Sequence, residues 1–129
     1  MRHICQRQLL CKTAAGNRVD ILSITENHPF QDLDKGYIVI TARIHPGESV
    51  SSYVCNGILD FLLSSNETAR KLRQNFVFKI IPMLNPDGVI HGNYRSSLSG
   101  YDLNRKWENP SKHYHAEIYH LKSFMKHLQ

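Results

Sequence analysis

Three short runs of apolar and β-branched residues predict the strands of a sheet. The first run covers residues 19–25, and the second, residues 37–42, leads directly into a polar turn. The third run, residues 76–84, is almost unbroken in its apolar character, which is typical of a central strand covered on both faces. Pro82 is expected near the end of this strand or at a bulge, because proline cannot donate a hydrogen bond to the ladder. Residues 1–17 have mixed polarity and end in a turn signal.

Apolar residues between and after these runs recur with helical spacing. The spacing predicts a helix over residues 50–63, a short basic helix over 68–74 and a final helix close to residue 129. The order strand, strand, helix, strand, helix predicts a three-layer α/β architecture. The apolar faces expected to pack are Val50, Val54, Ile58, Phe61 and Leu62, widened by Tyr53 and Leu59, on the first helix, and Ile118, Leu121, Phe124, Met125 and Leu128 on the last.

Two segments between these elements are predicted to be irregular. Residues 85–88, Asn-Pro-Asp-Gly, predict a strong turn. Residues 89–112 are polar and contain glycine, and a loop of that length in a compact domain usually has a function. The residues in it that draw attention are Arg95, Asn104, Arg105 and the single tryptophan, Trp107.

A histidine and a glutamate follow the second predicted strand. His45 and Glu48 are separated by a Pro-Gly pair, and the helix pattern starts directly after them. In open α/β sheets, ligands bind just beyond the carboxyl ends of the strands. Imidazole and carboxylate are suitable zinc ligands, and catalytic zinc sites have three protein ligands. We therefore interpret His45 and Glu48 as two of three zinc ligands, although an ordinary polar turn has the same composition.

Composition indicates the size of the domain, the charge of its partners and the cellular compartment. The 129 residues correspond to one domain or part of one, and the net charge of +5 favours acidic partners. The positive charges are scattered rather than clustered, which argues against a nucleic-acid-binding arm. The three cysteines fit no paired metal spacing and are expected to be free thiols in a reducing, cytoplasmic compartment. Neither a signal peptide nor a membrane span is expected, because the amino terminus is too polar and the apolar runs are too short.

Four histidines near the end of the chain are a second possible metal site. His113, His120 and His127 fall seven residues apart and would share one helical face, with His115 nearby. Because no carboxylate or cysteine completes a ligand set there, a solvated helix face is the favoured interpretation.

Four motifs in a fixed order resemble the zinc metallocarboxypeptidases, and more narrowly their cytosolic branch. They are HPGE at 45–48, PMLNPDGV at 82–89, GNYR at 92–95 and DLNR at 102–105. The resemblance implies a three-layer α/β/α carboxypeptidase-like fold with a mixed sheet, of which residues 1–129 are the amino-terminal portion of the catalytic domain. It also implies one zinc ion per complete domain, held in part by His45 and Glu48. A ligand set of two histidines and one glutamate is that of carboxypeptidase A.

The resemblance also implies roles for three residues of the long loop. Arg95 matches the arginine that polarises the scissile carbonyl, and Asn104 and Arg105 match the pair that binds the terminal carboxylate of the substrate. A guanidinium fork beside an amide donor suits two-point contact with a carboxylate. In this branch the substrates are carboxy-terminal or branched glutamates on acidic protein tails such as polyglutamylated tubulin. Arg43 and Lys106 are additional candidates for contacts with glutamate side chains, or are unpaired surface cations.

Two parts of the family pattern have no counterpart in this sequence. The third zinc ligand of the family, a histidine, comes from a strand well downstream of DLNR, and its general-base glutamate comes later still. His113 and His115 are not assigned as the third ligand. We therefore expect the chain as given to lack appreciable peptidase activity. A non-catalytic module that binds acidic carboxy-terminal tails is the main alternative. A nucleic-acid-binding domain is disfavoured, because aromatic and basic residues are not interleaved as in a stacking platform.

Overall fold

One mixed sheet forms the centre of the computed structural model, which describes residues 4–26 and 35–128. Its strands are β1 (Cys5–Lys12), β2 (Arg18–Ile24), β3 (Gly36–Thr41) and β4 (Phe76–Ile81), in the spatial order β1-β2-β4-β3. β2 runs antiparallel to both of its neighbours, whereas β3 and β4 are parallel. The three predicted strands are thus confirmed as β2, β3 and β4, and β4 ends just before Pro82.

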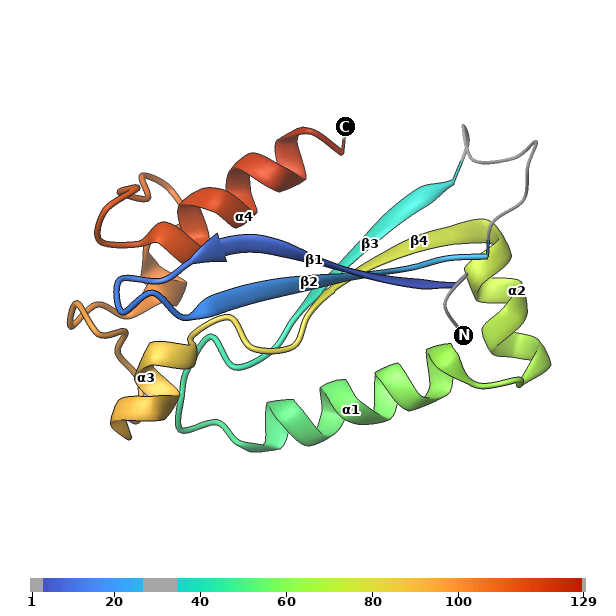
Figure 1. The fold of residues 1–129 in the computed structure, drawn as a ribbon, viewed down its shortest axis with the longest axis horizontal. Helices are drawn as coiled ribbons and strands as arrows, with labels where there is room; N and C mark the ends of the chain where they lie inside the picture. Colours follow the sequence, from blue (N-terminus) through green and yellow to red (C-terminus); the bar gives the residue numbers. More distant parts are fainter. Residues whose placement is uncertain (1–3, 27–34, 129) are drawn as a thin grey trace.

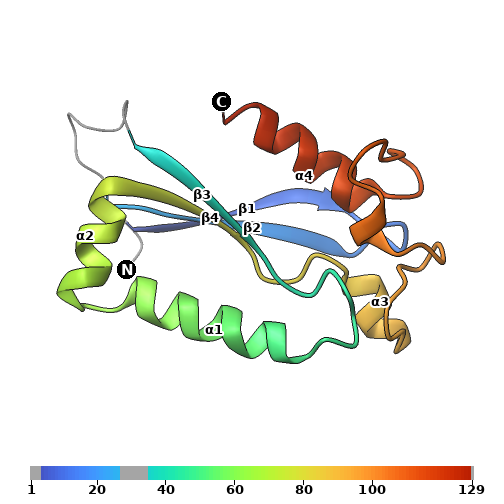
Figure 2. The ribbon, with the colours of Figure 1, turned by 180° about the vertical axis from the view of Figure 1, so that it is seen from behind.

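Helices cover both faces of this sheet, as the three-layer prediction requires (Figures 1 and 2). α1 (Val50–Leu63) and α2 (Glu67–Asn75) lie on one face, and α4 (Ala116–Lys126) lies on the other. Each interface has its own buried cluster. The cluster on the α1 face contains Ile24, Ala42, Cys55, Leu62, Phe78 and Ile80, and the one on the α4 face contains Cys11, Val19, Ile21, Ile81, Leu84, Leu103, Ile118 and Leu121.

Three sequence expectations are wrong. Residues 85–88 are not a plain turn but the start of a helix, α3 (Pro86–His91), and a single 3-10 turn, η1 (Leu103–Arg105), interrupts the segment predicted to be irregular. In addition, residues 5–12 form β1, a strand that was not predicted. The buried face of α1 differs from the predicted one, because Val50 and Val54 are 71% and 57% exposed.

α3 lies at the same end of the sheet as the amino end of α1 (Figure 1). The turn between β3 and α1, which contains His45 and Glu48, is therefore flanked by α3 and by the loop that follows it. Across the described residues, no helix has the length and apolar character needed to cross a membrane.

Candidate metal centre

The turn that contains His45 and Glu48 is closed by Arg43. Arg43 has a positive φ of 56°, an uncommon conformation for a residue with a side chain, and it redirects the chain at the end of β3. Its guanidinium donates to the carbonyl oxygen of Pro46, through Nε at 3.1 Å and Nη2 at 2.7 Å, and to Ser52 Oγ at 2.9 Å. Arg43 is therefore a structural part of this turn and not an unpaired surface cation.

Asn85 fixes the turn from the side of β4. Its side chain is fully buried, its Nδ2 donates to the Ile44 carbonyl at 3.2 Å, and its backbone N–H donates to the Arg43 carbonyl at 3.1 Å. Its Oδ1 accepts from the backbone N–H of Gly88 at 3.0 Å, which caps the start of α3. Asn85 thus joins the turn that contains His45 and Glu48, called the metal turn below, to the amino terminus of α3.

His45 is held between two carboxylates. Its side chain is only 8% exposed, with Nδ1 3.1 Å from Glu48 Oε1 and Nε2 2.9 Å from Asp102 Oδ1. Asp102 also accepts the backbone N–H of Asn104 at 2.9 Å and Arg95 Nε at 2.8 Å. Partial burial alone would raise the pKa of the Asp102 carboxyl, but these hydrogen bonds, that of His45 foremost, outweigh it and lower the pKa below its usual value.

These contacts are compatible with a metal bound by His45. In the tautomer that donates from Nε2 to the Asp102 carboxylate, the lone pair of the neutral ring lies on Nδ1. That lone pair faces an oxygen of Glu48, which is also an acceptor, so a cation between the two atoms makes the contact favourable. Two ligands of a tetrahedral zinc ion lie about 3.4 Å apart when each is about 2.1 Å from the metal. The donor types and the observed 3.1 Å separation therefore fit zinc.

The structure brings Arg95 and Asn104 to the same centre through Asp102. The Arg95 guanidinium is about half exposed, and Asn104 and Arg105 are exposed on η1. Arg105 follows Asn104 directly, and its Nη1 lies 3.4 Å from the Asn104 carbonyl oxygen. Sequence reasoning missed Asp102, the residue that joins these groups. Its only signal was its place at the start of DLNR, where an acidic residue caps a helical turn.

The other sequence candidates lie outside this centre. Lys106 Nζ lies 4.8 Å from the centroid of the Tyr101 ring, in a cation–π contact. His113 precedes α4 instead of lying on it. His115 occupies the N-cap position of α4 without a side-chain capping bond, and its Nδ1 accepts from the Ser111 backbone N–H at 3.0 Å. Within residues 4–26 and 35–128, no cluster of three or more histidine, cysteine or acidic side chains is placed to hold a metal.

Gly47 connects the metal turn to the loop that contains Arg95. Its N–H donates to the Tyr94 carbonyl at 2.7 Å, and a Cβ at this position would lie 2.3 Å from Tyr94 Cδ2 and 2.8 Å from that carbonyl oxygen. The exposed Tyr94 ring is free to swing aside, but the backbone oxygen is not, so a side chain at Gly47 forces the turn and the loop apart.

We therefore expect Gly47→Ala to destabilise the fold by about 1–3 kcal/mol through overpacking. The measurement is urea-induced unfolding. Gly57→Ala is the matched control, because Gly57 lies in α1 with no atom within 4 Å of its Cβ position, and removing a helical glycine should stabilise by about 0.5–1 kcal/mol. Equal effects of the two substitutions would show that the contact between Gly47 and Tyr94 is unimportant.

Known proteins are similar in sequence to this chain. The sequence model of the family described as zinc carboxypeptidase matches residues 2–124. The chain belongs to the zinc carboxypeptidase family. Human cytosolic carboxypeptidase 4 is 52% identical over 95% of this chain and 12% of its own length, and cytosolic carboxypeptidase 6 of Caenorhabditis elegans is 50% identical over 92% and 26%.

Solved structures of carboxypeptidases have the same fold as this chain. The metallo-carboxypeptidase of Burkholderia cenocepacia superposes with a TM-score of 0.89 at 28% identity, over 97% of this chain and 33% of its own. That of Pseudomonas aeruginosa superposes with a TM-score of 0.83 at 27% identity, over 94% and 32%. The predicted carboxypeptidase-like fold is thus confirmed, and the chain spans a third or less of each of these four proteins.

Proposed function

We propose that this chain forms part of a zinc-dependent metallocarboxypeptidase of the cytosolic type, to which it contributes two metal ligands and the residues that bind the substrate carboxylate. The observation that carries the proposal is the arrangement around Asp102. One carboxylate contacts Nε2 of His45, whose Nδ1 faces Glu48, and also holds Arg95 and the turn that contains Asn104. This arrangement supports a single centre for metal ligation, charge stabilisation and carboxylate binding.

Each side chain has a task that suits its chemistry. A zinc ion bound by His45 and Glu48 would supply Lewis-acid polarisation of the scissile carbonyl. Arg95 is held by Asp102 through Nε, which leaves its terminal nitrogens to stabilise negative charge on that carbonyl oxygen. Removing one such donor in other hydrolases costs about 2.7–4 kcal/mol. The fork of Arg105 and the amide of Asn104 bind the terminal carboxylate, which selects for the end of a chain.

Glutamate is the substrate residue that we propose, at carboxy termini or at side-chain branches of proteins such as tubulin. The motifs of the cytosolic branch and the net charge of +5 support an acidic protein tail as the partner. The names of the cytosolic relatives and three unpaired cysteines support a cytoplasmic location.

We further propose that the 129 residues alone hold zinc weakly and do not hydrolyse peptides, which would leave them able to bind acidic tails without cleaving them. Two protein ligands bind zinc less firmly than three, and the described residues place no third one beside His45 and Glu48. Release of glutamate from a polyglutamylated peptide by the purified chain with zinc would contradict this second proposal and would leave the first intact.

The test of the metal centre is a zinc titration of the purified chain in competition with a chromophoric chelator. We expect one weakly bound zinc ion per chain, and loss of that binding in His45→Ala, because the substitution removes one of two ligands. His127→Ala is the matched control, since His127 is exposed at the end of α4 and its side chain hydrogen-bonds only the Ser123 carbonyl within the described residues. Zinc binding that survives in His45→Ala would refute the centre.

A further inference from the structure

Trp107 makes a hydrogen bond that fixes the orientation of Asn104. Its indole Nε1 lies 3.0 Å from Asn104 Oδ1. An indole N–H only donates, so the Asn104 atom that faces it must be the amide oxygen. The opposite end of the amide, Nδ2, therefore points away from Trp107. It has no hydrogen-bond partner among the residues that the structure describes, and Asn104 is exposed.

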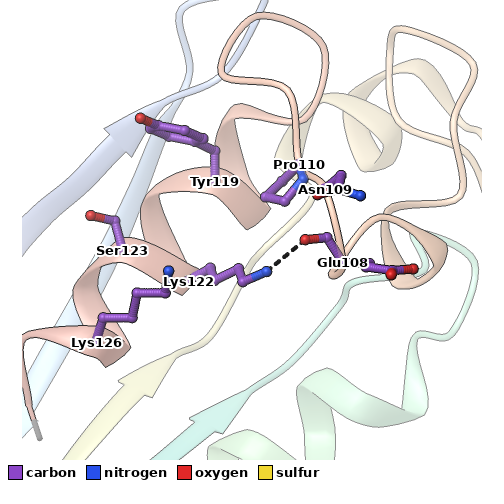
Figure 3. Close-up of a pocket in the computed structure, with 7 residues that line it drawn as sticks. All are labelled: Glu108, Asn109, Pro110, Tyr119, Lys122, Ser123 and Lys126. Atoms are coloured by element: carbon purple, nitrogen blue, oxygen red, sulfur yellow. Dashed lines mark hydrogen bonds between the residues drawn. The ribbon is translucent and has the colours of Figure 1, made fainter.

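Trp107 is held in place through both its ring and its backbone. Its ring packs against the buried cluster on the α4 face of the sheet. Its backbone carbonyl accepts from Lys122 Nζ at 2.7 Å, and the same ammonium group donates to the Glu108 carbonyl, also at 2.7 Å. Figure 3 shows Lys122 reaching from α4 to this loop. The segment from Asp102 to Glu108 is thus anchored at its start by the Asp102 carboxylate, which accepts the Asn104 N–H, and at its end by Lys122.

We propose that Trp107 is a positioning residue for carboxylate recognition: its N–H holds the Asn104 oxygen so that the amide NH₂ is presented to the terminal carboxylate of a peptide. This inference rests on the proposed function, in which Asn104 and Arg105 bind that carboxylate. A free asparagine amide populates two orientations, and one of them would direct an oxygen toward the anion. The hydrogen bond from the indole N–H excludes that orientation before the peptide binds. This lowers the conformational entropy that is lost on binding.

Simple core packing is the competing role for Trp107, and the two roles make different predictions. If the ring only fills space, any side chain of the same shape should replace it without effect. Loss of the ring should then lower the stability of the fold and leave peptide recognition unchanged. If the N–H orients Asn104, then removing that single group should weaken recognition of a carboxylate while the fold and the binding of uncharged chain ends remain unchanged.

The chain contains one tryptophan, so an isosteric analogue is introduced at that position alone. Expression in a tryptophan auxotroph with 3-benzothienylalanine replaces the indole N–H by sulfur, and Trp107→Phe is the genetically encoded counterpart. The probes are two short oligoglutamate peptides, one with a free terminal carboxylate and one with a terminal carboxamide. Calorimetry gives both affinities, and ¹⁵N NMR follows the Asn104 side-chain NH₂, which is assigned with Asn104→Asp.

In the native chain we expect tighter binding of the free carboxylate and a shift of the Asn104 NH₂ signal only with that peptide. In the sulfur analogue we expect the preference for carboxylate over carboxamide to fall about three- to tenfold, the weight of one oriented hydrogen bond, with the carboxamide affinity unchanged. The thermal unfolding midpoint should remain that of the native chain.

An unchanged preference in the analogue would overturn the role of Trp107 and leave the proposed function standing. A native chain that does not distinguish the two peptides would overturn the carboxylate site itself, and this inference with it.

Discussion

Asp102→Ala is expected to weaken zinc binding by about 10- to 100-fold, although Asp102 is not itself a proposed ligand. In the native chain Asp102 Oδ1 lies 2.9 Å from His45 Nε2, and a hydrogen bond donated from Nε2 leaves the lone pair of Nδ1 directed toward Glu48. Without it, the imidazole populates both tautomers and rotates, and only a fraction of molecules present a metal-binding nitrogen. The measurement is the competition titration used for the native chain.

Two variants separate this orienting effect from a loss of charge. Asp60→Ala removes one negative charge from the exposed surface of α1, where Asp60 accepts from Asn56, and should leave zinc affinity unchanged. Asp102→Asn keeps one oxygen for His45 but places an NH₂ group against Arg95 Nε–H, so its zinc affinity should fall less than that of the alanine variant. If Asp102→Ala binds zinc as tightly as Asp60→Ala, the orienting role assigned to Asp102 is wrong.

The apolar run that predicted β4 reflects the burial of that strand, and β1 has no comparable run. Residues 76–84 have a nearly continuous apolar run because β4 is a central strand, with neighbours on both sides and helices on both faces. β1 gave no such pattern, because it is an edge strand on which only Cys11 is fully buried and Leu9 is 43% exposed. Mixed polarity suits a strand that touches the core along one short stretch, and the same composition also occurs in loops.

The packing face of α1 could not be read from its sequence for a related reason. Apolar residues occur around most of this helix, so helical spacing alone did not distinguish the face that meets the sheet from the face that does not. The structure buries Cys55 and Leu62 and leaves Val50 and Tyr53 71% and 79% exposed. Tertiary contacts with β3 and β4, which no local pattern encodes, made the selection.

The candidate site was proposed from short motifs. His45 and Glu48 were proposed from their spacing and donor chemistry, and Arg95 and Asn104 through the family resemblance of the strings GNYR and DLNR. Asp102 was missed because its role depends on His45, which is 57 positions away in the sequence and adjacent only in the fold. A capping aspartate that also accepts from an imidazole has the same local sequence as one that does not.

Asp87→Ala is expected to cost about 3–5 kcal/mol of folding free energy through the loss of three hydrogen bonds to a charged group, a large part of the stability of a domain of this size. Asp87 was predicted to be part of a simple turn, but it lies in the first turn of α3 and is 1% exposed. Its Oδ1 accepts from Thr13 Oγ1 at 2.6 Å and Asn17 Nδ2 at 2.8 Å, and its Oδ2 accepts from the Ala15 N–H at 3.0 Å. Alanine leaves all three donors without this acceptor, and buried unpaired polar groups are costly.

These bonds join the turn between β1 and β2 to α3, which also supports the metal turn through Asn85 and Gly88. The measurement is urea-induced unfolding, with hydrogen exchange of the Ala15 amide as the local readout. Asp20→Ala is the control, because Asp20 pairs with Arg7 and Arg18 near the surface, where ion pairs contribute at most about 1 kcal/mol. Asp87→Asn should resemble the alanine variant, since an amide NH₂ placed among three donors repels at least one of them. Equal unfolding free energies for Asp87→Ala and Asp20→Ala would show that α3 is held by apolar packing instead of by this buried carboxylate.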